Sequence, residues 1–141
     1  MLTGFQHLHS TLAVVLLLGL IVSIGVTFAN FSGNKPYNRK IALLGLITSH
    51  LQLIVGLVYF FALGHHTKFV SGLMQNAELR FKVVEHPLMM LLAVILITIG
   101  YSRAKRMTDS KQANKTVLIF YIIGLIFVLS RLPWSTWTLI N

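Results

Sequence analysis

The stretch Leu8–Ala29, "LHSTLAVVLLLGLIVSIGVTFA", decides the fold because it contains no aspartate, glutamate, lysine or arginine. A helix of about 20 apolar residues is long enough to cross a hydrocarbon layer of roughly 30 Å. Further apolar runs follow at Ile41–Leu63, Pro87–Ser102 and Thr116–Thr138. Backbone polar groups inside lipid must find partners within the protein, so we predict that all these runs are helices. The third helix is expected to begin upstream of Pro87.

The composition agrees with a membrane protein. The chain has 141 residues, of which 55% are hydrophobic and 11% are charged, against about 25% charged in an ordinary soluble domain. Its mean hydropathy is +0.77. The short connections predict an all-α, four-helix up-down bundle that forms a single transmembrane domain over residues 1–141. The chain contains no cysteine, which excludes disulfides and thiolate metal sites.

The basic residues predict the orientation in the membrane. The net charge is +9, but the basic residues lie in short loops between apolar runs, which argues against nucleic-acid binding. Eight of the twelve lysines and arginines lie in the first and third loops: Lys35, Arg39, Lys40, Arg103, Lys105, Arg106, Lys111 and Lys115. These loops are therefore expected in the cytoplasm, with both termini and the second loop outside. We expect an integral protein of a bacterial inner membrane, in contact with the lipid bilayer.

Helical periodicity separates the two histidines of the first helix. His7 and His9 are two residues apart and point about 200° apart, so both cannot face the interior of the bundle. The residues on the side of His9 are mostly small or polar later in the helix: Ala13, Leu16, Leu20, Ser23 and Thr27. We therefore predict that His9 faces the interior and that His7 lies near the outer membrane surface.

The second helix separates Gln52 from His50 in the same way. Gln52 shares its face with small and polar residues, which allow helices to approach closely: Gly45, Thr48, Ser49, Gly56 and Tyr59. His50 then points away from that face, toward lipid or toward another chain. Because an unpartnered histidine in lipid is unfavourable, we interpret the surface near His50 as a contact within a homodimer or a larger membrane complex. The alternative is that the facing of this helix is reversed.

The sequence "VVEHPLMMLL", residues Val83–Leu92, places ionisable groups at the start of the third helix. His86 aligns with Met90, Ala93, Ile97 and Gly100, partly a face of small residues. Pro87 fits the first turn of a helix, where its missing N–H is tolerated. If the helix begins earlier, Pro87 instead marks a kink.

The fourth helix carries Arg131 near its outer end, in line with Gly124, Phe127, Ser135 and Thr138. One interpretation is an arginine that extends to the lipid headgroups. The other is a partner for an acidic group such as Glu85 or for a cofactor carboxylate. Trp134 and Trp137 are typical of an aromatic belt at the membrane interface.

Depth in the membrane pairs His9 with His86. His9 lies about 15 Å and His86 roughly 12 Å outward from the midpoints of their helices, at 1.5 Å per residue. Two neutral imidazoles at one depth on different helices can ligate haem iron, so we predict a haem b site with His9 and His86 as its metal ligands. The alternative is that each histidine only forms hydrogen bonds near the interface. The adjacent His65 and His66 are weak evidence for a divalent metal, because no carboxylate accompanies them.

Several short motifs are spread over the first three predicted helices. His9 is followed by a small residue four positions later, Ala13, and Gln52 and Gly56 form a Gln-x-x-x-Gly motif in "LQLIVG". The outer loop carries Ser-Gly-Leu in "FVSGL", and "EHPLMMLLAV" then opens the next helix with His86. In order and rough spacing, the chain resembles half of heme A synthase, in which two related four-helix bundles are joined.

The resemblance implies that His9 and His86 ligate haem. We expect Gln52 and Arg131 to be further cofactor-binding residues. The chain departs from the family where Ser10 replaces an arginine and Gln6 replaces a glutamate, and where an insertion precedes Ser-Gly-Leu. Because that glutamate is the residue expected to support oxidation of the haem, we do not expect a single copy to be an enzyme. A haem-modifying activity is expected to need a dimer.

Two functional hypotheses follow. The first is a b-type cytochrome-like protein that binds one haem near the outer membrane face and serves electron transfer or haem handling. The second is a non-enzymatic accessory or assembly subunit of a larger membrane complex, respiratory or other, without a functional haem. A carboxylate beside a metal ligand, as Glu85 is beside His86, can hold that ligand in orientation.

The topology leads to the first testable prediction. Single cysteines introduced as Ser32→Cys and Gln112→Cys are expected to resist a membrane-impermeant thiol reagent in intact cells, because both lie beside the basic loops. Both should react after the membrane is permeabilised. Labelling of both from outside would contradict the orientation.

Overall fold

The structure is a computed structural model that describes residues 2–135 and 137. Its elements are helices, and no strand occurs among the described residues. The long helices are α1 (Leu2–Ser32), α2 (Arg39–Ala62), α4 (His86–Lys105) and α5 (Ser110–Ser130). Short 3-10 turns at His65–Thr67 and Leu73–Gln75 and a short helix, α3 (Ala77–Arg80), connect α2 to α4. The all-α, four-helix fold class predicted from the sequence is confirmed.

Four segments are long and apolar enough to cross a membrane: Leu2–Ser32, Arg39–Ala62, Ala77–Lys105 and Ser110–Ser130. This finding suggests an integral membrane protein in contact with lipid. The last helix ends at Ser130, earlier than the predicted end at Thr138, which lies outside the described residues. The cause is Pro133, because the residue before a proline is disfavoured in helical conformation.

The buried faces are the ones that the periodicity predicts. In α1 the buried residues include Ala13, Leu16, Leu20, Ser23 and Thr27. In α2 they include Gly45, Thr48 and Ser49, and in α4 Ala93, Ile97 and Gly100. His9, Gln52 and His86 are partly buried, whereas His7 is exposed.

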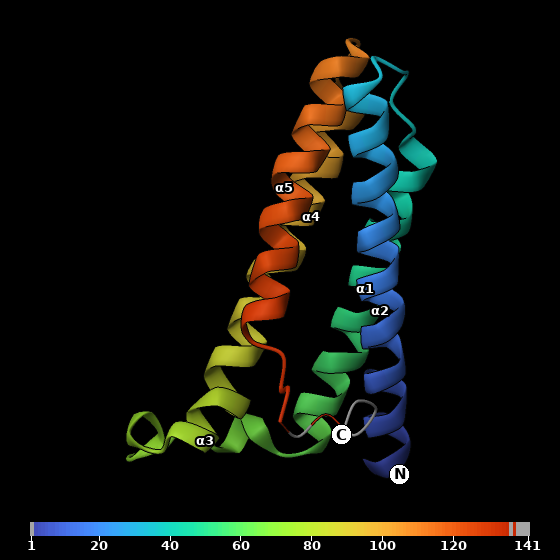
Figure 1. The fold of residues 1–141 in the computed structure, drawn as a ribbon. Helices are drawn as coiled ribbons and strands as arrows, with labels where there is room; N and C mark the ends of the chain where they lie inside the picture. The colour runs from blue at the N-terminus through green and yellow to red at the C-terminus, as the bar shows by residue number, and fades with distance from the viewer. Residues whose placement is uncertain (1, 136, 138–141) are drawn as a thin grey trace.

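The helices form two pairs, α1 with α2 and α4 with α5, that diverge from one end of the molecule (Figure 1). The connections 33–38 and 106–109 lie together at the narrow end, and α3 and the N-terminal end of α1 lie at the wide end. The narrow end therefore carries the two basic loops. The wide end carries the first turns of α1 and α4 and the last turn of α2.

Buried hydrogen bonds join the helices near the narrow end. The Ser23 hydroxyl donates to the Ile41 carbonyl at 2.6 Å and accepts from the Gly45 N–H at 3.2 Å, which joins α1 to α2. The Tyr121 hydroxyl donates to the Ala42 carbonyl at 2.6 Å, which joins α5 to α2. Nearby, the Asn114 amide donates to the carbonyl of Lys35 at 3.2 Å. Both helix pairs are thus held together at this end.

The third span begins well before Pro87. A π-helical turn at Phe81–Glu85 links α3 to α4, and the His86 N–H donates to the Phe81 carbonyl, five residues back. Pro87 has no N–H to offer to the carbonyl of Val83, and the wider turn lies directly before it. The structure therefore favours the interpretation in which the helix begins earlier and Pro87 accompanies a local irregularity. Such π-turns are frequent at functional sites.

Close packing of α4 on α5 leads to a prediction about stability. A Cβ at Gly100 would lie 2.5 Å from the Cβ of Phe120, so Gly100→Ala must push the two helices apart. We expect a loss of about 1–3 kcal/mol in the free energy of unfolding, measured as a lower midpoint of thermal unfolding in detergent. Gly25→Ala is the matched control, because a Cβ there meets nothing within 4 Å. Equal midpoints for the two variants would contradict this packing.

Candidate functional site

The two predicted histidines lie side by side at the wide end of the bundle. The ring centroids of His9 on α1 and His86 on α4 are 6.2 Å apart, and the ring planes are nearly perpendicular at 85°. The two residues belong to different helix pairs, so this edge-to-face contact joins the two pairs. Tyr59 on α2 also contacts His9, with ring centroids 5.8 Å apart.

The hydrogen bond of His86 determines which ring nitrogen is free. Its Nδ1 lies 2.7 Å from the backbone carbonyl oxygen of Arg131. A carbonyl oxygen only accepts hydrogen bonds, so Nδ1 carries the proton and donates. The neutral ring then has a lone pair at Nε2. A backbone carbonyl on the second nitrogen is the usual support of a histidine that binds a metal.

His9 is positioned by α2. A Cβ at Gly56 would lie 3.1 Å from Cε1 of His9, so the glycine makes room for the ring. The Gln52 side-chain amide donates to the backbone carbonyl of His9 at 2.9 Å. Nδ1 of His9 and Oε1 of Gln52 are both buried without a hydrogen-bond partner. Unpaired buried polar atoms are costly, and here two of them lie at one site.

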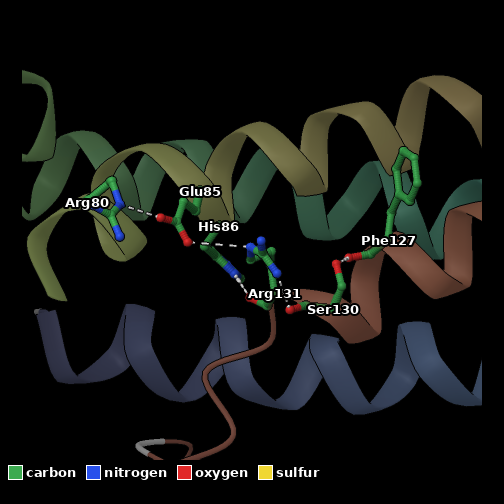
Figure 2. Close-up of polar contacts among 6 residues, drawn as sticks. All are labelled: Arg80, Glu85, His86, Phe127, Ser130 and Arg131. Carbon is green, nitrogen blue, oxygen red and sulfur yellow. Dashed lines mark hydrogen bonds and ion pairs between the residues drawn. The ribbon is translucent and has the colours of Figure 1, made fainter. Parts of the chain in front are cut away.

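Arg131 and Glu85 form an ion pair beside His86 (Figure 2). Glu85 lies between two arginines, with 2.6 Å from Oε2 to Nε of Arg80 and 3.5 Å from Oε1 to Nε of Arg131. Of the two interpretations of Arg131, the structure therefore supports the acidic partner. The same residue supplies the carbonyl that accepts from His86, so Glu85 acts on the histidine through Arg131.

A cavity of about 760 Å³ lies against both histidines. This volume is within the range of about 300–1,000 Å³ that is usual for small-molecule and cofactor sites. Polar lining residues are Gln6, His9, Ser10, Ser49, Gln52, Tyr59, His65, Lys82 and His86. The rest of the lining is mostly apolar, and Ala13 and Gly56 leave space beside the rings. Arg131 does not line the cavity and contacts the site through its backbone.

The other outer histidines do not join this pair. His65 and His66 lie against different phenylalanines, Phe60 at 5.5 Å and Phe61 at 5.0 Å between ring centroids. Burial, together with the nearby charges of Lys82 and Lys68, lowers the pKa of His65. No group of three histidine, aspartate or glutamate side chains suited to a metal ion occurs in the part of the chain that the structure describes.

The lipid-facing position predicted for His50 is wrong. Its Nε2 lies 2.9 Å from the Thr98 hydroxyl on α4. That hydroxyl donates to the Val94 carbonyl at 2.7 Å, so Nε2 of His50 is the donor in the first bond. The side chain is partly buried and has its partner within the chain. The prediction of a homodimer or larger complex therefore loses the reason that suggested it.

The sequence alone did not reveal the place of Trp137. After α5 the chain turns out of the helix and runs on toward the wide end, between the helix pairs (Figure 1). Trp137 is buried there with Ala13, Val128 and Leu132, and it lines the cavity. Trp134 is 48% exposed and fits the interfacial belt. Pro133 is the signal for this turn, since it ends the helix before the second tryptophan.

No family model matches the chain, and comparisons with curated proteins and with solved structures return no match. The resemblance to half of heme A synthase therefore rests on the short motifs alone and stays a prediction.

The His50–Thr98 bond leads to a prediction that separates packing within the chain from association between chains. His50→Leu and Thr98→Val should each lower the midpoint of thermal unfolding in detergent slightly, with a coupling of about 0.6 kcal/mol in a double-mutant cycle. The oligomeric state, measured by light scattering, should not change. If His50→Leu instead gives a fully folded monomer that has lost a partner chain, the original interpretation of His50 as a contact between chains is right.

Proposed function

We propose that this protein binds one b-type haem between His9 and His86 and serves electron transfer or haem handling. The observation that carries the proposal is the pair of adjacent imidazoles beside a cavity of suitable size. Their ring centroids are 6.2 Å apart, and these two side chains would hold the iron of the haem.

The residues present fit this cofactor in three respects. His86 is held as the tautomer that offers Nε2, through its bond to the Arg131 carbonyl. Nδ1 of His9 is buried without a hydrogen-bond partner. The mostly apolar cavity supplies the surroundings that a porphyrin requires, and the bound haem would provide one-electron chemistry.

The electrostatic surroundings favour a stable orientation of His86. Glu85 holds the guanidinium of Arg131 by an ion pair, and Arg131 in turn holds the imidazole of His86 through its backbone carbonyl. This arrangement gives a physical reason for the acidic residue at the start of α4. Gln52 supports His9 in a comparable way, by a bond to its backbone.

The basic loops lie at the end opposite to the histidines, which supports an outer-face site in a bacterial inner membrane. We propose that a single chain is a haem carrier and not an enzyme. A protein without haem would be an accessory or assembly subunit, and the experiment below separates these functions.

The visible spectrum of the purified protein tests the proposal. Protein extracted in mild detergent from haem-replete cells should show a low-spin spectrum, with a sharp α band on reduction. His9→Ala and His86→Ala should each remove or convert that spectrum, because each removes one axial ligand. Folding of the variants is checked by circular dichroism.

His7→Ala and His66→Ala are the matched controls, since both histidines are exposed and neither lines the cavity. They should keep the full spectrum. If the correctly folded protein stays colourless, the accessory-subunit function is the one that remains. If both ligand variants keep an unchanged spectrum, any haem is bound elsewhere.

A further inference from the structure

The cavity has an apolar rim on one side of the bundle, between α2 and α4. On α2 and α4, four of its lining side chains are large, apolar and strongly exposed: Leu57 at 47%, Phe61 at 56%, Leu88 at 53% and Leu91 at 41%. Leu57 and Phe61 share one face of α2, and Leu88 and Leu91 share one face of α4, by their spacings of four and three residues. We call these four side chains the α2–α4 rim.

The opposite side of the cavity, between α1 and α5, is closed. Ala13 of α1 packs with Val128 of α5 and with Leu132 and Trp137 from the segment that follows α5, and all four are buried. Leu132 and Trp137 thus fill this side, and among residues 2–135 and 137 no comparable segment covers the α2–α4 rim. The cavity is therefore asymmetric, with one closed side and one apolar, exposed side.

The polarity of the cavity changes from its rim to its interior. The unpaired Nδ1 of His9 and Oε1 of Gln52 are buried, whereas the α2–α4 rim is entirely apolar. Lys82 is the only charged residue among the lining side chains that the structure describes. In a span that lies in lipid, a rim of exposed leucine and phenylalanine contacts acyl chains and not water. A ligand that suits this cavity has an apolar periphery and a group that binds the inner polar atoms.

We propose that the α2–α4 rim is a lateral opening through which the cavity takes its ligand from the bilayer. The ligand is a largely apolar molecule dissolved in the lipid. The identification of this molecule as haem rests on the proposed function. The opening itself depends only on the rim, the closed side and the cavity.

Fluorescence quenching of Trp137 tests the opening without haem. Trp134→Phe leaves Trp137 as the only tryptophan in the full chain, which contains two. Trp137 lines the cavity and is only 6% exposed, so strong quenching requires a molecule inside the cavity. The protein, prepared from haem-depleted cells, is placed in vesicles with a brominated long-chain alkane dissolved in the lipid, or with iodide in the water.

The rim variant Leu57→Phe with Leu91→Phe narrows the opening. The control variant Leu18→Phe with Ile21→Phe adds the same bulk to exposed positions of α1, which do not line the cavity. We expect quenching by the brominated alkane to exceed quenching by iodide, and to fall several-fold in the rim variant only. Equal quenching in the rim and control variants, dominant quenching by iodide, or no quenching by either reagent would each overturn the opening.

Haem uptake separates this inference from the proposed function. Vesicles preloaded with ferric haem are mixed with haem-depleted protein, and growth of the low-spin absorbance is followed. The rim variant should load several-fold more slowly than the control variant and reach the same final spectrum. Loading at equal rates overturns the lateral route while the haem function stands. A colourless protein with rim-dependent quenching overturns haem as the ligand while the opening stands.

Discussion

Helices in lipid have no hydrophobic force that holds them to one another, because acyl chains are as apolar as leucine side chains. Their association must come from close packing and from buried hydrogen bonds, and several of these contacts lie at one end of this protein. Ser23, Gly45 and Tyr121 bring α1, α2 and α5 together there. The position of every side chain at the other end depends on this junction, because the helix pairs diverge from it (Figure 1).

The divergence creates the cavity and also the need to fill it. Where helices separate, polar atoms lose the partners that a closely packed neighbour would supply. Nδ1 of His9 and Oε1 of Gln52 are buried without partners at this end. Leu132 and Trp137 fill one side of the gap. The remaining volume lies against His9 and His86, one residue from each helix pair, so a ligand bound by both histidines would join the pairs at their open end.

The charged residues at the wide end support the site without entering it. Glu85 lies between Arg80 and Arg131 and contacts both, and it does not line the cavity. Its effect reaches His86 through the backbone carbonyl of Arg131. An ionisable group near lipid is expensive, and pairing of each charge at the end of the span reduces that cost.

Periodicity and depth were sufficient to predict the helices, their buried faces and the proximity of His9 and His86, because these follow from a fixed rise and rotation per residue. The interpretation of His50 failed because it assumed that a side chain off the main interior face has no partner in the bundle. Thr98 supplies that partner from α4. A face is defined by residue positions along one helix, whereas a contact also depends on where the neighbouring helix lies.

The sequence by itself determined that the chain forms four apolar helices, because backbone groups in lipid must be satisfied within the protein. It also determined which histidines share a depth. Only the tertiary structure decided that the helix pairs diverge, that Trp137 packs into the gap, and that Arg131 contacts both Glu85 and His86. These features depend on contacts between residues far apart in the chain, such as His86 with Arg131 and Ala13 with Trp137. No local pattern encodes the distance between such residues.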